Sequence, residues 1–168
     1  MTSSSQPIHY RPLQKFLHWF VVLGVITQIA IHEPMVRVYE ALSTGVTADT
    51  VDTYFAWMHV GVGTLVLLAV LLRLFLRYRY GVPGHAPGTS ATQAKLANAM
   101  HNALYILLLG MVATGMATWN GIAPLGQVHF MINVILFFLV LAHAVAALYN
   151  QFVKKDGTMR RMMRRQAS

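Results

Sequence analysis

The sequence predicts an all-α protein, a four-helix transmembrane bundle with both termini in the cytoplasm. Of its 168 residues, 56% are hydrophobic and only 11% are charged, which is too apolar for a typical soluble domain. Four apolar segments each have about the length that a helix needs to cross a bilayer, roughly 20 residues. Lys and Arg residues are divided very unevenly between the two sides of the bundle that these segments would form.

The four expected spans cover residues 16–31, 54–76, 99–118 and 128–153. Helices are expected because a segment in lipid must satisfy its own backbone hydrogen bonds. Pro and Gly residues mark three loops between the spans, at 32–53, 77–95 and 120–127. The first apolar run lacks a small-residue cleavage pattern after it, so we expect it to remain as a span. The whole chain, 1–168, is expected to form one domain.

The basic residues predict the orientation of the bundle. Twelve of the thirteen lie on the side of the two termini: Arg11, Lys15, Arg73, Arg77, Arg79, Lys95, Lys154, Lys155, Arg160, Arg161, Arg164 and Arg165. Only Arg37 lies on the other side, together with four of the five acidic residues: Glu33, Glu40, Asp49 and Asp52. Excess Lys and Arg mark the cytoplasmic side of a bacterial inner-membrane protein. The net charge of +8 therefore indicates topology and contact with anionic lipid headgroups, not nucleic-acid binding.

Five histidines lie within the apolar segments, and two of them, His129 and His143, share the last one. Fourteen helical residues are about four turns and about 21 Å, so both imidazoles point to nearly the same face at opposite depths. The topology places His18 at the cytoplasmic level and His59 at the periplasmic level. Pairing by level joins His18 with His143, and His59 with His129. Ionisable groups inside a bilayer are costly and usually mark function.

Two histidine pairs at two depths predict two bis-histidine haems and electron transfer across the membrane. Iron held by two imidazoles has no open position, which suits electron transfer better than oxygen activation. The absence of cysteine excludes iron–sulfur clusters and covalent c-type haem. His101, near the start of the third span, is either an alternative cytoplasmic-level ligand or a contact beyond the ligands. Arg73 is expected either to pair with a propionate of the inner haem or to reach the lipid headgroups.

Two other classes of protein remain possible from these residues. A single intramembrane histidine can also be a helix–helix hydrogen-bonding group, which leaves a membrane scaffold as an alternative. A metal-ion transporter would use histidines and some of the ten methionines. No Asp or Glu lies within an expected span, apart from Glu33 at an edge, which argues against such a transporter and against a zinc hydrolase.

Five short motifs resemble, in order and spacing, those of the bacterial cytochrome b561 family over about residues 9–165. They are Tyr10–Trp19, Trp57–Gly61, Arg73–Arg77, Leu96–His101 and Leu141–Leu148. The resemblance implies two non-covalent b-type haems and the same histidine pairs. It also implies ubiquinone as co-substrate, and the activity of a superoxide oxidase that takes electrons from periplasmic superoxide. The expected partners are membrane lipid, quinone, and superoxide or a periplasmic redox protein.

The chain departs from the resemblance in two places. Asn150 stands where such members carry a histidine, seven residues after the last ligand. The first periplasmic loop is acidic, and a negative loop repels superoxide, which is an anion. Only His32 and Arg37 would offset this charge locally. A quinol-oxidising subunit that serves another periplasmic redox protein is therefore the alternative within the same class.

Overall fold

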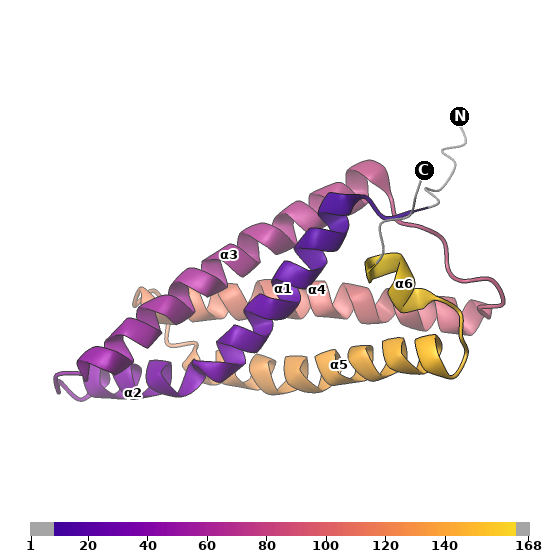
Figure 1. Cartoon of the computed structure of the whole chain (residues 1–168). Helices are drawn as coiled ribbons and strands as arrows, with labels where there is room; N and C mark the ends of the chain where they lie inside the picture. Colours follow the sequence, from indigo (N-terminus) through magenta and orange to yellow (C-terminus); the bar gives the residue numbers. More distant parts are fainter. Residues whose placement is uncertain (1–8, 164–168) are drawn as a thin grey trace.

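A computed structural model describes residues 9–163, and this part of the chain is built of six helices (Figure 1). They are α1 (Pro12–Ala30), α2 (His32–Ser43), α3 (Thr50–Tyr80), α4 (Ala91–Trp119), α5 (Gly126–Phe152) and α6 (Thr158–Met163). α1, α3, α4 and α5 are long and apolar enough to cross a membrane, which confirms the four expected spans. The helices differ most from the expected spans at the start of α4, which begins at Ala91 instead of residue 99.

Polar caps explain why the helices extend past the apolar segments. Asp49 begins α3, because its carboxylate accepts hydrogen bonds from two backbone N–H groups of the first turn, at 2.8 and 3.2 Å. Ser90 begins α4 with a reciprocal pair, in which its hydroxyl and the side chain of Gln93 each accept the other's backbone N–H, at 3.2 and 3.3 Å. Gly81 follows the end of α3 with a φ of +70°, which favours glycine.

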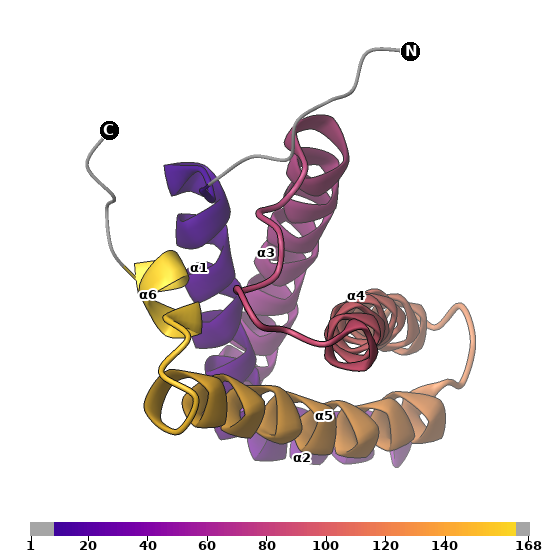
Figure 2. The same cartoon turned by 90° about the vertical axis from the view of Figure 1, so that its right-hand side faces the viewer.

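The four spans pack as two pairs, α1 on α3 and α4 on α5, with α3 also touching α4 (Figure 2). The buried core of the first pair is small: Leu17, Ala69 and Leu76, with the partly buried Phe20 and Val21 packed against them. At Gly24 the two backbones approach so closely that a Cβ would overlap the side chain of Val66. Close approach at a small residue is the usual way in which helices associate in lipid.

The spans give the bundle two ends, which we call the terminal end and the α2 end. The terminal end comprises the start of α1, the end of α3, the start of α4, the end of α5, and α6 (Figure 1). There the Trp19 Nε1–H donates to the Met162 carbonyl at 3.2 Å, and Arg161 donates to the Gly84 carbonyl at 2.8 Å. α6 is therefore attached to α1 and to the loop after α3. Arg164 and Arg165 of the expected basic tail lie outside the described residues.

The segment 32–53 contains the helix α2, so the expectation of an entirely irregular loop there was wrong. Pro34 lies in the first turn of α2, where a missing N–H breaks no helical hydrogen bond. Gly45 lies beyond the last turn, with a φ of +71°. Val38 is 2% exposed and α2 packs on α3, so the helix is amphipathic and covers this end of the bundle.

Candidate functional site

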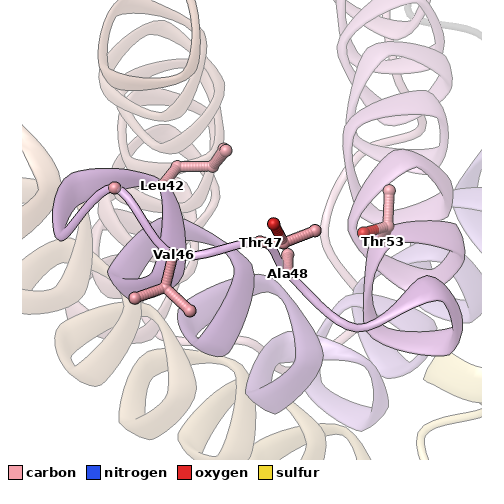
Figure 3. A pocket seen from close by; sticks show the side chains of 6 residues that line it. Leu42, Val46, Thr47, Ala48 and Thr53 are labelled. Atoms are coloured by element: carbon pink, nitrogen blue, oxygen red, sulfur yellow. The ribbon is translucent and has the colours of Figure 1, made fainter.

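Two hollows lie at opposite ends of the bundle. The hollow at the α2 end is open, between the end of α2 and the start of α3 (Figure 3), and is lined by Leu42, Gly45, Val46, Thr47, Ala48 and Thr53. These side chains neither titrate nor bind metals, so this hollow offers no chemistry. A smaller cavity at the terminal end is lined mainly by polar, charged and aromatic residues: Tyr10, Gln14, Arg73, Arg77, Val82, His101, Tyr105 and Met162.

Three half-buried histidines meet at the terminal end, one each from α1, α4 and α5. The imidazole centroids of His18 and His143 are 6.4 Å apart, and those of His101 and His143 are 5.3 Å apart. The structure thus brings together the two residues paired by level in the sequence. It also places the alternative ligand, His101, beside the same partner.

Arg73 of α3 lies at the level of these histidines. It is close enough to interact electrostatically with His18, His101 and His143. Its Nη1 donates to the Gln14 carbonyl at 3.0 Å, which directs the guanidinium into the bundle. The cavity therefore has the positive charge that a carboxylate requires.

Tyr10 adds a neutral hydrogen-bonding group to the same cavity. Burial raises the pKa of its phenol, although the nearby guanidinium groups of Arg77 and Arg73 act in the opposite direction. The phenol therefore stays protonated at neutral pH, and its O–H is a donor that adds no negative charge to the cavity.

At the α2 end, His59 of α3 and His129 of α5 are close enough to interact electrostatically. The Nδ1 atom of His129 lies 2.9 Å from the Met111 carbonyl oxygen. A carbonyl oxygen only accepts, so Nδ1 carries the proton and the lone pair of Nε2 is left for a ligand. This is the second contact that metal-bound histidines usually make.

Gly115 on α4 provides the space for the ring of His129. A Cβ there would lie 2.8 Å from Cε1 of His129, so any larger residue would displace the imidazole. The ring is held between two elements, the backbone of α4 and its own helix α5. Neither Gly115 nor Met111 was among the residues expected at the site, because a backbone contact leaves no mark on side-chain chemistry.

Gln28 is a further residue of the α2 end, and it was not among the residues expected there. Its Nε2 donates to the carbonyl oxygen of His59 at 2.9 Å. A signal was available, since Gln28 is a lone amide in the apolar part of α1. Buried polar groups in lipid-facing helices usually face a partner.

The surface of the α2 end is anionic, because its single arginine is already paired. Arg37 donates to both carboxylate oxygens of Asp52, at 2.8 and 2.7 Å, and reaches Glu33 at 3.4 Å. These contacts raise the pKa of the Arg37 guanidinium, and the hydrogen bond to Asp52 is the largest cause. Arg37 therefore balances two acids and leaves little positive potential for an incoming anion.

Although His18, His101 and His143 lie near one another, no three His, Asp or Glu side chains within residues 9–163 are placed so that they could hold a free metal ion. Haem iron requires only two protein ligands, because the porphyrin supplies four nitrogens. A membrane bundle in which histidines of different helices lie near one another at two levels has the layout of a helical cytochrome, in which haem lies between helices.

Comparison with known proteins agrees with this class. The family described as prokaryotic cytochrome b561 matches residues 9–165. Cytochrome b562 of Cereibacter sphaeroides is 36% identical over 162 residues, covering 92% of this chain and 95% of the relative. Cytochrome b561 homolog 1 of Escherichia coli is 29% identical, covering 90% and 95%. The probable superoxide oxidase CybB of Yersinia pestis is 28% identical, covering 92% and 95%.

The chain belongs to the prokaryotic cytochrome b561 family. It is a multi-pass protein of the bacterial inner membrane that binds haem b and transfers electrons.

Proposed function

We propose that this protein binds two b-type haems, one between His18 and His143 and the other between His59 and His129. The observation that carries the proposal is that α5 holds two histidines, His129 in its first turn and His143 in the half toward the terminal end. These two histidines are about 21 Å apart along the helix. Each lies close to a histidine of α1 or α3. Bound haem supplies a one-electron carrier at each level.

The residues present fit such a group. The hydrogen bond from His129 to the Met111 carbonyl fixes the tautomer that a ligand needs. At the terminal end, Arg73 offers positive charge to a propionate carboxylate, and the phenol of Tyr10 offers a hydrogen bond. We assign His101 to a contact beside the ligand pair, because His18 and His143 are the pair expected from level and from the family motifs.

We further propose that the terminal end faces the cytoplasm, because twelve of the thirteen basic residues lie on that side. A reporter active only in the periplasm should stay silent at the C-terminus. The same reporter inserted within residues 44–48, between α2 and α3, should be active. Periplasmic activity at the C-terminus would invert the topology and exchange the two haem levels.

For the reaction, we propose superoxide as the donor at the α2 end and ubiquinone as the acceptor. Two superoxide anions each give up one electron and leave as O₂, while ubiquinone takes up two electrons and two protons to become ubiquinol. Charged superoxide crosses lipid poorly, so a donor formed in the periplasm would react at the periplasmic level. The similarity to a probable superoxide oxidase of Yersinia pestis supports this reaction.

The second candidate reverses the direction of electron flow. Ubiquinol would give two electrons and two protons, and a periplasmic redox protein would take the electrons. The pairing of Arg37 with Asp52 and Glu33 favours this candidate, because it leaves the α2 end with little attraction for an anion. A pulse of superoxide distinguishes the two: reduction of the oxidised protein supports the first, and reduction by ubiquinol alone supports the second.

The decisive experiment for the proposal is the haem content of the purified protein. Four histidines in two pairs should give about two haems per chain in a pyridine haemochrome assay. The reduced-minus-oxidised spectrum should resolve two components with different midpoint potentials. A content near one haem per chain would contradict the two-pair arrangement.

A further inference from the structure

Two buried polar atoms at the α2 end lack a hydrogen-bond partner among residues 9–163: Nδ1 of His59 and Oε1 of Gln28. The residues that carry them already touch, because Nε2 of Gln28 donates to the backbone carbonyl of His59 at 2.9 Å. A buried polar atom without a partner costs free energy, and native proteins rarely contain one without a reason. Here a potential donor and a potential acceptor lie on neighbouring groups.

His129, the histidine near His59, has a hydrogen bond at Nδ1 that His59 lacks. The Nδ1–H of His129 is hydrogen-bonded to the Met111 carbonyl, whereas the Nδ1 of His59 has no partner in the described part of the chain. Metal-bound histidines almost always donate their second N–H to a carboxylate, a carbonyl or water. The amide oxygen of Gln28 is a carbonyl oxygen of this kind, carried by a neighbouring helix.

The backbone of α3 leaves space for this amide. Gly63 lies four residues after His59, about one helical turn further on and on the same face. A Cβ at Gly63 would lie 2.7 Å from Nε2 of Gln28, so a larger residue would push the amide away. At Gly61 a Cβ would meet nothing within 4 Å. A Cβ at Gly63 would therefore displace the amide of Gln28, whereas a Cβ at Gly61 would displace nothing.

We propose that Gln28 is a positioning residue for the haem of the α2 end. In this structure its Oε1 and the Nδ1 of His59 are not hydrogen-bonded to each other. When His59 binds iron through Nε2, the Oε1 would accept the Nδ1–H, while Nε2 of the same side chain holds the His59 backbone carbonyl. This inference rests on the proposed role of His59 as a ligand. A hydrogen bond to Nδ1–H makes the imidazole more basic, which stabilises oxidised iron and lowers the midpoint potential of that haem.

The test is a redox titration of the intact protein carrying Gln28→Met, which has similar length but no amide. Both haems should be retained, and the midpoint potential of the α2-end haem, identified by its loss in His59→Ala, should rise. At a fixed ambient potential its ratio of reduced to oxidised form should change by up to about tenfold. The low-spin EPR signal of the same haem should shift, while the other haem keeps its potential and signal.

Gln28→Glu tests the rescue, because it keeps an acceptor oxygen in the same place. It should hold the potential at or below the wild-type value. Thr27→Val is the control on the neighbouring position, since the Thr27 hydroxyl donates to the Leu23 carbonyl of its own helix, and it should change neither haem. Loss of the α2-end haem in Gln28→Met but not in Gln28→Glu would also support the role.

Gly63→Ala displaces the amide without altering Gln28, so it should shift the potential of the same haem in the same direction. Gly61→Ala is its matched control and should leave the potential unchanged. Two retained haems with unchanged potentials and EPR signals in Gln28→Met would overturn the inference and leave the histidine pairs intact. An equal shift of both haems would overturn it as well. Two haems retained in His59→Ala would instead overturn the proposed ligands.

Discussion

The two ends of the bundle present histidines in opposite electrostatic settings. At the terminal end, His18, His101 and His143 lie near Arg73, which also lines a cavity with Arg77. At the α2 end, an uncharged amide contacts the backbone of one histidine, and the surface around it is acidic. Histidine thus lies near positive charge at the terminal end, and near a neutral amide and acidic surface groups at the α2 end.

This difference predicts the order of the midpoint potentials of the two proposed haems. Positive charge near a haem favours the reduced form, whereas hydrogen bonds that increase ligand basicity favour the oxidised form. The haem of the terminal end should therefore have the higher midpoint potential. Electrons entering at the α2 end would then move downhill toward the terminal end, which agrees with a periplasmic donor and a quinone acceptor.

The largest expected effect separates the two ends completely. His59→Ala and His129→Ala should each remove the α2-end haem, and His143→Ala should remove the other, because iron is ligated only by side chains at its own level. Each variant should keep about half of the haem, measured by haemochrome assay, and one component of the redox titration. Loss of the same component in His129→Ala and His143→Ala would show that the levels are misassigned.

At the terminal end, variants of His18 and His101 show which of these two histidines ligates the haem iron together with His143. With His18 as the ligand, His18→Ala loses the terminal-end haem and His101→Ala keeps it with a shifted potential. The reverse result would make His101 the partner of His143, which its shorter centroid distance of 5.3 Å also allows. Both variants therefore belong in the same series.

The spans and the meeting of histidines by level were predictable from the sequence, because both depend on helix length and on the rise per residue. Fourteen residues on one helix place His129 and His143 about 21 Å apart along α5 and on nearly the same face. The extended ends of the helices were less predictable. Caps such as Asp49 and Ser90 are polar, and a hydropathy pattern stops before it reaches them.

The remaining parts of the site depend on contacts between helices, which the pattern of one helix does not contain. α2 was not expected because it is a short helix of 12 residues that contains Pro34 and Arg37, and such a segment resembles a polar loop in a hydropathy pattern. The roles of Gly115 and Met111 depend on which part of α4 faces His129. Only Gln28 carried a visible signal, as a polar residue in an apolar span.

The second-largest effect is a change of midpoint potential on removal of a positive charge at the terminal end. Arg73→Gln should lower the midpoint potential of the terminal-end haem and leave that of the α2-end haem unchanged. At an effective dielectric constant of about 20 and with partial screening by solvent, the loss of one nearby charge should shift the potential by some tens of millivolts. The matched control is Arg79→Gln on the same helix, because Arg79 is exposed and stacks over Tyr80. A comparable shift in both variants would mean that overall charge, and not the position of Arg73, sets the potential.

The smallest effect is expected at the surface of the α2 end, where superoxide would arrive. Because Arg37 is paired with Asp52 and Glu33, this surface should repel the anion weakly instead of attracting it. Salt screens such repulsion, since the Debye length falls from about 30 Å at 0.01 M to about 8 Å at 0.15 M ionic strength. Reduction of the oxidised protein by a superoxide pulse in a stopped-flow instrument should therefore change little, or rise slightly, with salt.

Neutralising the acids sharpens this test of the α2 end. The double variant Glu33→Gln and Glu40→Gln should speed the reduction about two- to threefold at low salt and have no effect at high salt, where the field is screened. Asp156→Asn is the control, because it removes the one acidic residue at the terminal end and should leave the rate unchanged. A steep slowing of the wild-type reaction with salt would show that Arg37 still attracts the anion despite its ion pairs. Absence of haem reduction at every ionic strength would exclude superoxide as the donor, and the paired Arg37 would then support the quinol-oxidising direction.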